Sequence, residues 1–105
     1  MRRQGCPDRA RRGAITPPEL LEKVPPEYPP QARAERREGR AILQAVIDVE
    51  GAVCAITVLR VPPGSEDFAA AAVEAVRRWR YRPALAPHGH PVPVYFTILV
   101  EFRLS

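Results

Sequence analysis

The chain has 105 residues, which is enough for one domain with one compact core, because a chain of this length buries only about two thirds of its unfolded surface. Five of its 16 basic residues and one of its 12 acidic residues fall within residues 1–15, so the net charge of +4 belongs to that segment and the rest of the chain is neutral. A neutral folded part argues against a basic nucleic-acid-binding surface on the domain.

No stretch approaches the roughly 20 apolar residues that span a bilayer, since the best one, 41–49, is interrupted by Gln44 and Asp48. The first residues contain no apolar run before Cys6, so neither a signal peptide nor a lipoprotein signal is predicted. Two cysteines are too few for a disulfide framework or a metal site. We interpret Cys54, in a predicted strand, as a small core residue.

In chain order, residues 1–15 are expected to form a disordered basic tail. Residues 16–29 hold many of the 13 prolines and are expected to form a stiff, extended linker. The folded domain is expected to cover residues 30–105. It begins with a short helix at 30–38, which ends at Gly39 in the left-handed conformation.

A β-hairpin follows, with strands at 40–49 and 52–61 and a turn at 50–51. Alternate residues of the first strand are apolar and are expected to face the core: Ala41, Leu43, Ala45, Ile47 and Val49. The other face of this strand carries Ile42 and Val46. We therefore expect that face to be partly covered, by the linker or by a second chain.

A long helix is predicted after Ser65, which is placed as its N-terminal cap, with Glu66 and Asp67 in the first turn, where the helix dipole favours acidic residues. Apolar residues at helical spacing predict a stripe that faces the sheet: Phe68, Ala72, Val76 and Trp79. Pro83 is expected to end this helical stretch. Apolar and polar residues then alternate from 94 to 104, which predicts an amphipathic final strand.

The order helix, strand, strand, helix, strand predicts an α+β fold. We expect a two-layer sandwich in which a three-stranded antiparallel sheet carries one long helix packed across it and a short N-terminal helix.

The order of five motifs, which together cover residues 25–104, resembles the C-terminal domain of the TonB family of energy transducers. The motifs are Tyr28 with Pro29 before the short helix, Gly39 at the first strand, Asp48 with Gly51 at the hairpin, Trp79, Arg80, Tyr81 and Pro83 after the long helix, and 94–102 as the last strand. The resemblance implies the same α+β fold.

The resemblance also implies a non-enzymatic periplasmic adaptor domain that binds a short segment of an outer-membrane TonB-dependent receptor by strand addition and supports active transport. The partner-binding residues that it implies are Tyr28, Pro29, Tyr95, Phe96, Thr97, Ile98, Leu99, Val100, Glu101 and Arg103. Inner-membrane motor proteins would be partners only if an anchor exists upstream. A free strand edge is also compatible with a strand-exchanged homodimer.

Other interpretations stay open at this point. The chain could be a stand-alone TonB-like interaction module without energy transduction, or, less strongly supported, a nucleic-acid binder that uses its basic tail. The final strand could be an ordinary edge that Glu101 and Arg103 protect from pairing. Tyr28 and Pro29 could serve only to fasten the short helix to the domain. Trp79 and Tyr81 are expected in the core.

Catalytic and metal sites are not predicted. His88 and His90 have a spacing seen in metal sites, but the surrounding loop offers no further ligands. Ser65 is explained as a helix cap, and no recognisable motif places a histidine and a carboxylate beside it. We expect no enzymatic activity and no cofactor.

Overall fold

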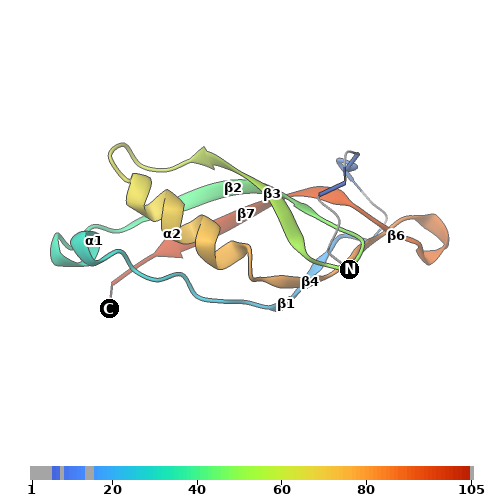
Figure 1. The fold of residues 1–105 in the computed structure, drawn as a ribbon, viewed down its shortest axis with the longest axis horizontal. Helices are drawn as coiled ribbons and strands as arrows, with labels where there is room; N and C mark the ends of the chain where they lie inside the picture. Colours follow the sequence, from blue (N-terminus) through green and yellow to red (C-terminus); the bar gives the residue numbers. More distant parts are fainter. Residues whose placement is uncertain (1–5, 8, 14–15, 105) are drawn as a thin grey trace.

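The structure is a computed structural model, and it describes residues 6–7, 9–13 and 16–104. Its elements in chain order are β1 (Glu19–Glu22), α1 (Pro30–Ala34), β2 (Gly39–Ile47), β3 (Val53–Arg60), α2 (Glu66–Val76), β4 (Arg80–Arg82), β5 (Ala84–Leu85), a short 3₁₀ turn (Pro87–Gly89), β6 (Pro91–Val92) and β7 (Val94–Phe102). Figure 1 shows α2 lying across β2 and β7, with β1 and β4 running along one side of the molecule.

The central sheet has three antiparallel strands in the order β3-β2-β7. The pairing of β2 with β7 runs without a shift from Gly39 opposite Phe102 to Ile47 opposite Val94. The pairing of β2 with β3 is shifted twice, and Ala55, at one of these β-bulges, has a positive φ of 51°. The predicted α+β sandwich, with a long helix across a three-stranded sheet, is confirmed.

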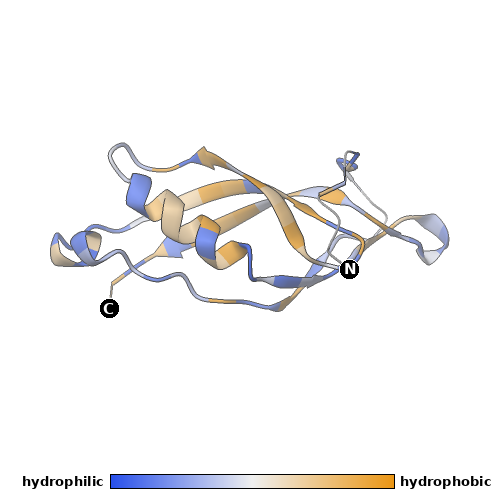
Figure 2. Cartoon of the chain, in the orientation of Figure 1, coloured by the Kyte–Doolittle hydropathy of each residue, from blue (hydrophilic) through white to orange (hydrophobic). Residues whose placement is uncertain are grey.

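The core lies between this sheet and α2. The alternate residues of β2 that face the helix are completely buried: Ala41, Leu43, Ala45 and Ile47. From the helix, Phe68 stacks on Phe102 of β7 with ring centroids 4.4 Å apart. Figure 2 shows that the central strands are largely hydrophobic. The predicted inward faces are confirmed except at Val49, which lies beyond the end of β2 and is 46% exposed.

Helix α2 ends at Val76, well before Pro83, so the predicted end of the helix is wrong. Residues 80–82 form β4 instead, which pairs with β1, and the Tyr81 N–H donates to the Gly51 carbonyl at 2.9 Å. These long-range partners hold the chain extended although no residue between Val76 and Pro83 breaks a helix. Trp79 and Tyr81 are buried in the core, as predicted.

Two other details at helix ends differ from expectation. Ser65 occupies the N-cap position, but its side chain makes no capping hydrogen bond. Helix α1 is shorter than predicted, and the residue with left-handed geometry is Arg36, at φ 57°, rather than Gly39. Glycine is required at position 39 for space, because a Cβ there would lie 2.9 Å from Pro62 and 3.3 Å from Phe68.

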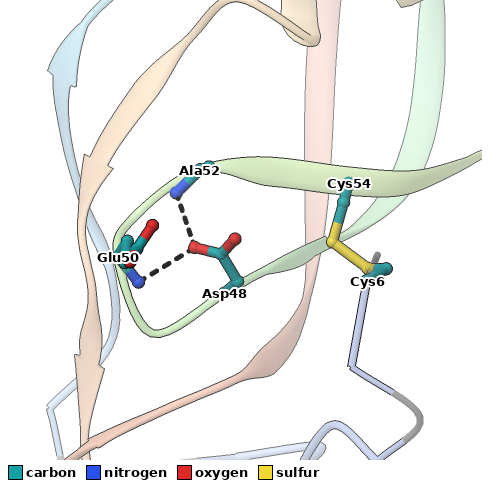
Figure 3. Close-up of a disulfide and its surroundings, with 5 residues drawn as sticks. All are labelled: Cys6, Asp48, Glu50, Ala52 and Cys54. Atoms are coloured by element: carbon teal, nitrogen blue, oxygen red, sulfur yellow. Dashed lines mark hydrogen bonds between the residues drawn. A yellow bond between two sulfur atoms is a disulfide. The ribbon is translucent and has the colours of Figure 1, made fainter. Parts of the chain in front are cut away.

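The segments before α1 contact the domain where the structure describes them. Cys6 forms a disulfide with Cys54 of β3, with Cα atoms 5.7 Å apart (Figure 3), so the interpretation of Cys54 as a simple core residue is wrong. The signal was absent because the spacing of one cysteine pair carries no information on distance in space. In the linker, the Val24 carbonyl accepts a hydrogen bond from Trp79 Nε1 at 2.7 Å. The disorder expected at 1–5, 8 and 14–15 lies outside the described residues.

Candidate protein-binding edge

The orientation of the β7 backbone follows from one contact at its start. The Tyr95 N–H donates to the Arg11 carbonyl at 2.8 Å, and the Arg11 N–H donates to the Pro93 carbonyl at 2.9 Å. The N–H of Tyr95 therefore points away from β2. In an antiparallel strand both backbone groups of one residue point to the same side, and the side alternates from residue to residue. Because the register with β2 is unbroken, Thr97 and Leu99 also point their N–H and C=O groups outward.

Glu101 shares this orientation, so a row of outward backbone groups runs along β7 at Thr97, Leu99 and Glu101. We call this row the outer edge of β7. Within the described part of the chain, β7 is paired only with β2 and, at Val94, with Arg11. No described strand covers the outer edge beyond that point. This is the arrangement that strand addition requires.

The side chains of β7 divide into two sets. Thr97, Leu99 and Glu101 are exposed on the sheet face opposite α2, which we call the open face. Leu99 is 48% exposed and lies opposite Ile42 of β2 in the strand register. The predicted contact residues of the other set face the core: Phe96, Ile98 and Val100. Their backbone N–H and C=O groups pair with β2, so this second set offers a partner neither backbone hydrogen bonds nor exposed side chains. Arg103 is exposed beyond the end of β7.

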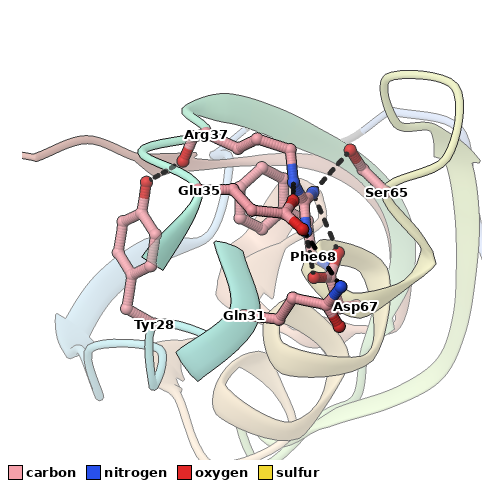
Figure 4. A network of polar contacts seen from close by, with 7 residues as sticks. All are labelled: Tyr28, Gln31, Glu35, Arg37, Ser65, Asp67 and Phe68. Carbon is pink, nitrogen blue, oxygen red and sulfur yellow. Dashed lines mark hydrogen bonds and ion pairs between the residues drawn. The ribbon is translucent and has the colours of Figure 1, made fainter. Parts of the chain in front are cut away.

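Tyr28 and Pro29 do not join this edge. The Tyr28 ring packs edge-on against Phe68 and Phe102, with centroid distances of 5.9 and 5.7 Å. Its hydroxyl donates to the backbone carbonyl of Arg37 (Figure 4), and Pro29 is buried. These contacts fasten the segment before α1 to the core. That is one of the two roles considered for Tyr28 and Pro29, the other being contact with a partner.

A polar network missed in the sequence lies beside Tyr28 (Figure 4). The Arg37 guanidinium pairs with Asp67 at 2.8 Å and with Glu35 at 2.7 Å. Hydrogen bonds from Arg37 hold the pKa of both carboxyl groups below their ordinary values, and the carboxylates raise the pKa of Arg37. Arg37 also approaches the Ser65 hydroxyl at 3.4 Å. The network joins the end of α1 to the start of α2, and no sequence motif predicts it.

The described part of the chain contains neither a cluster of metal-ligating side chains nor a membrane-crossing helix. No group of three or more histidine, cysteine or acidic side chains there is placed to hold a metal ion, and His88 and His90 are exposed in a loop. No helix in residues 6–7, 9–13 and 16–104 combines the length and hydropathy needed to cross a membrane.

Comparison with known proteins shows which family this domain resembles. Residues 24–104 match the family model described as Gram-negative bacterial TonB protein C-terminal. The chain is 32% identical over 81 residues to Protein TonB of Escherichia coli (strain K12), covering 77% of this chain and 34% of that protein. It therefore spans about a third of the length of this curated relative.

Two solved structures agree with that match. The solution NMR structure of the Pseudomonas aeruginosa TonB CTD has a TM-score of 0.71 and 27% identity, over 89% of this chain and 94% of that one. The TonB2 protein of Vibrio anguillarum has a TM-score of 0.60 and 25% identity, over 100% and 98% of the two chains. The chain belongs to the family of TonB C-terminal domains.

Proposed function

We propose that this domain is the receptor-binding part of a TonB-type energy transducer. It holds a short extended segment of an outer-membrane receptor along the outer edge of β7 and so supports active transport, without enzymatic activity of its own. The proposal rests on the outward backbone groups of Thr97, Leu99 and Glu101 in an edge strand that no described strand covers. Each backbone hydrogen bond to such a segment contributes a net 0.5 to 1.5 kcal/mol, roughly.

The side chains of the open face give this edge its preference for sequence. A receptor side chain that points to this face beside Leu99 meets an apolar surface, because Leu99 lies opposite Ile42. Glu101 lies opposite Arg40, so charges of both signs lie at the other end of the edge. We therefore expect an extended segment with an apolar residue near its centre.

The periplasm is the compartment that we propose for the domain. The Cys6–Cys54 disulfide supports this, because disulfides persist in oxidising compartments and are rare in the cytosol. Coupling to an inner-membrane motor is also part of the proposal, and it requires a membrane anchor in the complete protein.

A proline substitution at Leu99 tests whether the receptor segment binds along the outer edge of β7. Synthetic peptides covering periplasm-facing segments of outer-membrane receptors from the source bacterium are titrated into the labelled domain, and the dissociation constant is measured. Leu99→Pro removes an outward N–H, whereas Leu99→Ala removes the side chain and keeps the N–H. We expect Leu99→Pro to weaken binding about tenfold relative to Leu99→Ala, which corresponds to about 1.4 kcal/mol. Equal affinities for the two folded variants would contradict strand addition at this edge.

A further inference from the structure

The N-terminal segment already pairs with one end of the proposed binding edge. We call residues 9–12 the arm. Arg11 of the arm lies parallel to β7 opposite Val94. Its backbone forms hydrogen bonds with the Pro93 carbonyl and the Tyr95 N–H. The Arg12 guanidinium lies over the Tyr95 ring, 4.2 Å from its centroid. The arm thus occupies two outward groups next to the row that begins at Thr97.

The disulfide fixes the arm at its other end. Cys54 and Tyr95 both lie opposite Val46 in the strand register, so all three side chains share the open face. Cys6 is attached on the β3 side of Val46, and Arg11 lies on the outer side of β7. Val46 is only 3% exposed, although it points away from α2. The neighbours of Val46 on this face, Cys54 and Tyr95, are the residues that the N-terminal segment contacts, through the disulfide and through Arg11 and Arg12.

The arm itself makes few contacts with β7. Two backbone hydrogen bonds and one cation–π contact of an exposed arginine are the interactions that the structure shows for residues 9–12 with β7 and the residue before it. Ordering the backbone of a residue costs about as much free energy as a hydrogen bond contributes net. On its other side the arm leads to Thr16, which exchanges two backbone hydrogen bonds with Leu85. With the disulfide the arm is therefore anchored on both sides, which shortens the free segment and raises the effective concentration of the arm at the edge.

We propose that the arm is a disulfide-controlled cover on the end of the β7 edge at Pro93 and Tyr95. With the disulfide intact, an incoming strand pairs only from Thr97 onward. Opening of the disulfide releases the arm, and the edge gains two backbone groups for the partner. The part of the proposal that concerns the partner rests on the proposed function, whereas the release of the arm does not.

The release is a thiol–disulfide exchange with a dithiol reductant. A thiolate of the reductant attacks one sulfur of the Cys6–Cys54 bond and forms a mixed disulfide, and the other cysteine leaves as a thiolate that takes up a proton. The second thiol of the reductant, as its thiolate, then attacks the mixed disulfide. The reductant leaves in its oxidised cyclic form, and the second cysteine is freed and protonated. Both cysteines are half-buried rather than enclosed, so the bond is within reach of a small dithiol.

Amide hydrogen exchange of the full chain tests the release. In the oxidised protein we expect protection at Tyr95 and fast exchange at Thr97, which has the same orientation but no described partner. After treatment with dithiothreitol, and in the double variant Cys6→Ser with Cys54→Ser, the Tyr95 amide should exchange at least about tenfold faster. The inward amide of Ile98, which pairs with β2, should not change.

Two results would overturn the proposal. Unchanged protection of Tyr95 after the disulfide is opened would show that the arm holds without the tether. An equal increase at Ile98 would show that the disulfide stabilises the whole sheet rather than the arm.

Binding of the receptor peptides separates this regulation from the proposed function. We expect the double serine variant to bind a peptide that reaches Tyr95 about five- to 150-fold more tightly than the oxidised protein, because two hydrogen bonds are added. A peptide that binds both forms equally would overturn the regulation. Binding to neither form would contradict the proposed function and the regulation together, while the exchange of Tyr95 still decides whether the disulfide holds the arm.

Discussion

Gly51 is the residue whose replacement tests the packing of this fold most sharply. It lies in the turn between β2 and β3, is buried, and has a φ of +84°. A Cβ at this position would lie 1.8 Å from the Tyr81 carbonyl oxygen, which is backbone and cannot rotate aside. The same turn is held by Asp48, whose Oδ1 accepts hydrogen bonds from Glu50 and Ala52 (Figure 3). Gly51→Ala must therefore displace either the turn or β4.

The expected loss has three parts. A left-handed alanine costs about 1–2 kcal/mol. The hydrogen bond from the Tyr81 N–H to the Gly51 carbonyl contributes about 1 kcal/mol. Tyr81 is 5% exposed and packs edge-on against Phe96, so shifting it costs about 1–2 kcal/mol more. The free energy of unfolding should therefore fall by about 3–5 kcal/mol.

Gly64→Ala is the matched control, because Gly64 has a φ of +75° and nothing within 4 Å of its added Cβ. Only the left-handed cost of about 1–2 kcal/mol applies there. Urea unfolding followed by far-UV circular dichroism measures both variants, and a difference of about 2 kcal/mol separates their midpoints by about 1 M. Equal losses in the two variants would refute the close approach of the turn to Tyr81.

Two further substitutions probe the contacts that join distant segments. Asp67→Asn removes one of the two carboxylate partners of Arg37. Because the pKa of Asp67 is lowered from its ordinary value of 3.8, the stabilising effect of its charge is present above that value and is lost as pH falls through the lowered pKa. The variant should therefore unfold more easily than the parent near pH 7 and equally easily in strong acid. Trp79→Phe leaves the Val24 carbonyl without its donor and should lower the free energy of unfolding by about 1–3 kcal/mol, measured by circular dichroism.

The outcomes that contradict these two expectations are also measurable. A loss of stability in Asp67→Asn that is the same at all pH values would mean that the charge of the carboxylate is not what matters. For Trp79→Phe, unchanged stability would mean that the contact with Val24 does not hold the segment before α1.

The parts of the fold that were predicted correctly are those that the local spacing of apolar residues along the sequence indicates. The alternation in β2 and β7 and the helical spacing of Phe68, Ala72 and Val76 each reflect burial against one common core. The end of α2 was not predictable in this way, because residues 77–82 carry no helix breaker and their extended conformation depends on β1 and Gly51. Tertiary partners, rather than propensity, decide that segment.

At the candidate site, too, the local pattern predicted some features, while others depend on tertiary partners. The amphipathic pattern identified β7 and separated its core side chains from Thr97, Leu99 and Glu101. It could not show which backbone groups point outward, because this depends on the pairing of β7 with β2. Nor could it reveal that Arg11 pairs beside Val94, since that contact and the Cys6–Cys54 disulfide join segments that lie far apart in the sequence.

The pattern of amide protection along β7 with a bound receptor peptide tests the central claim most directly. Hydrogen exchange is compared residue by residue in the free and the saturated domain. Strand addition predicts new protection at Thr97, Leu99 and Glu101, with no change at Ile98 and Val100, whose amides already face β2. Protection that does not alternate along β7, or that appears on another element while the outward amides stay unprotected, would contradict it.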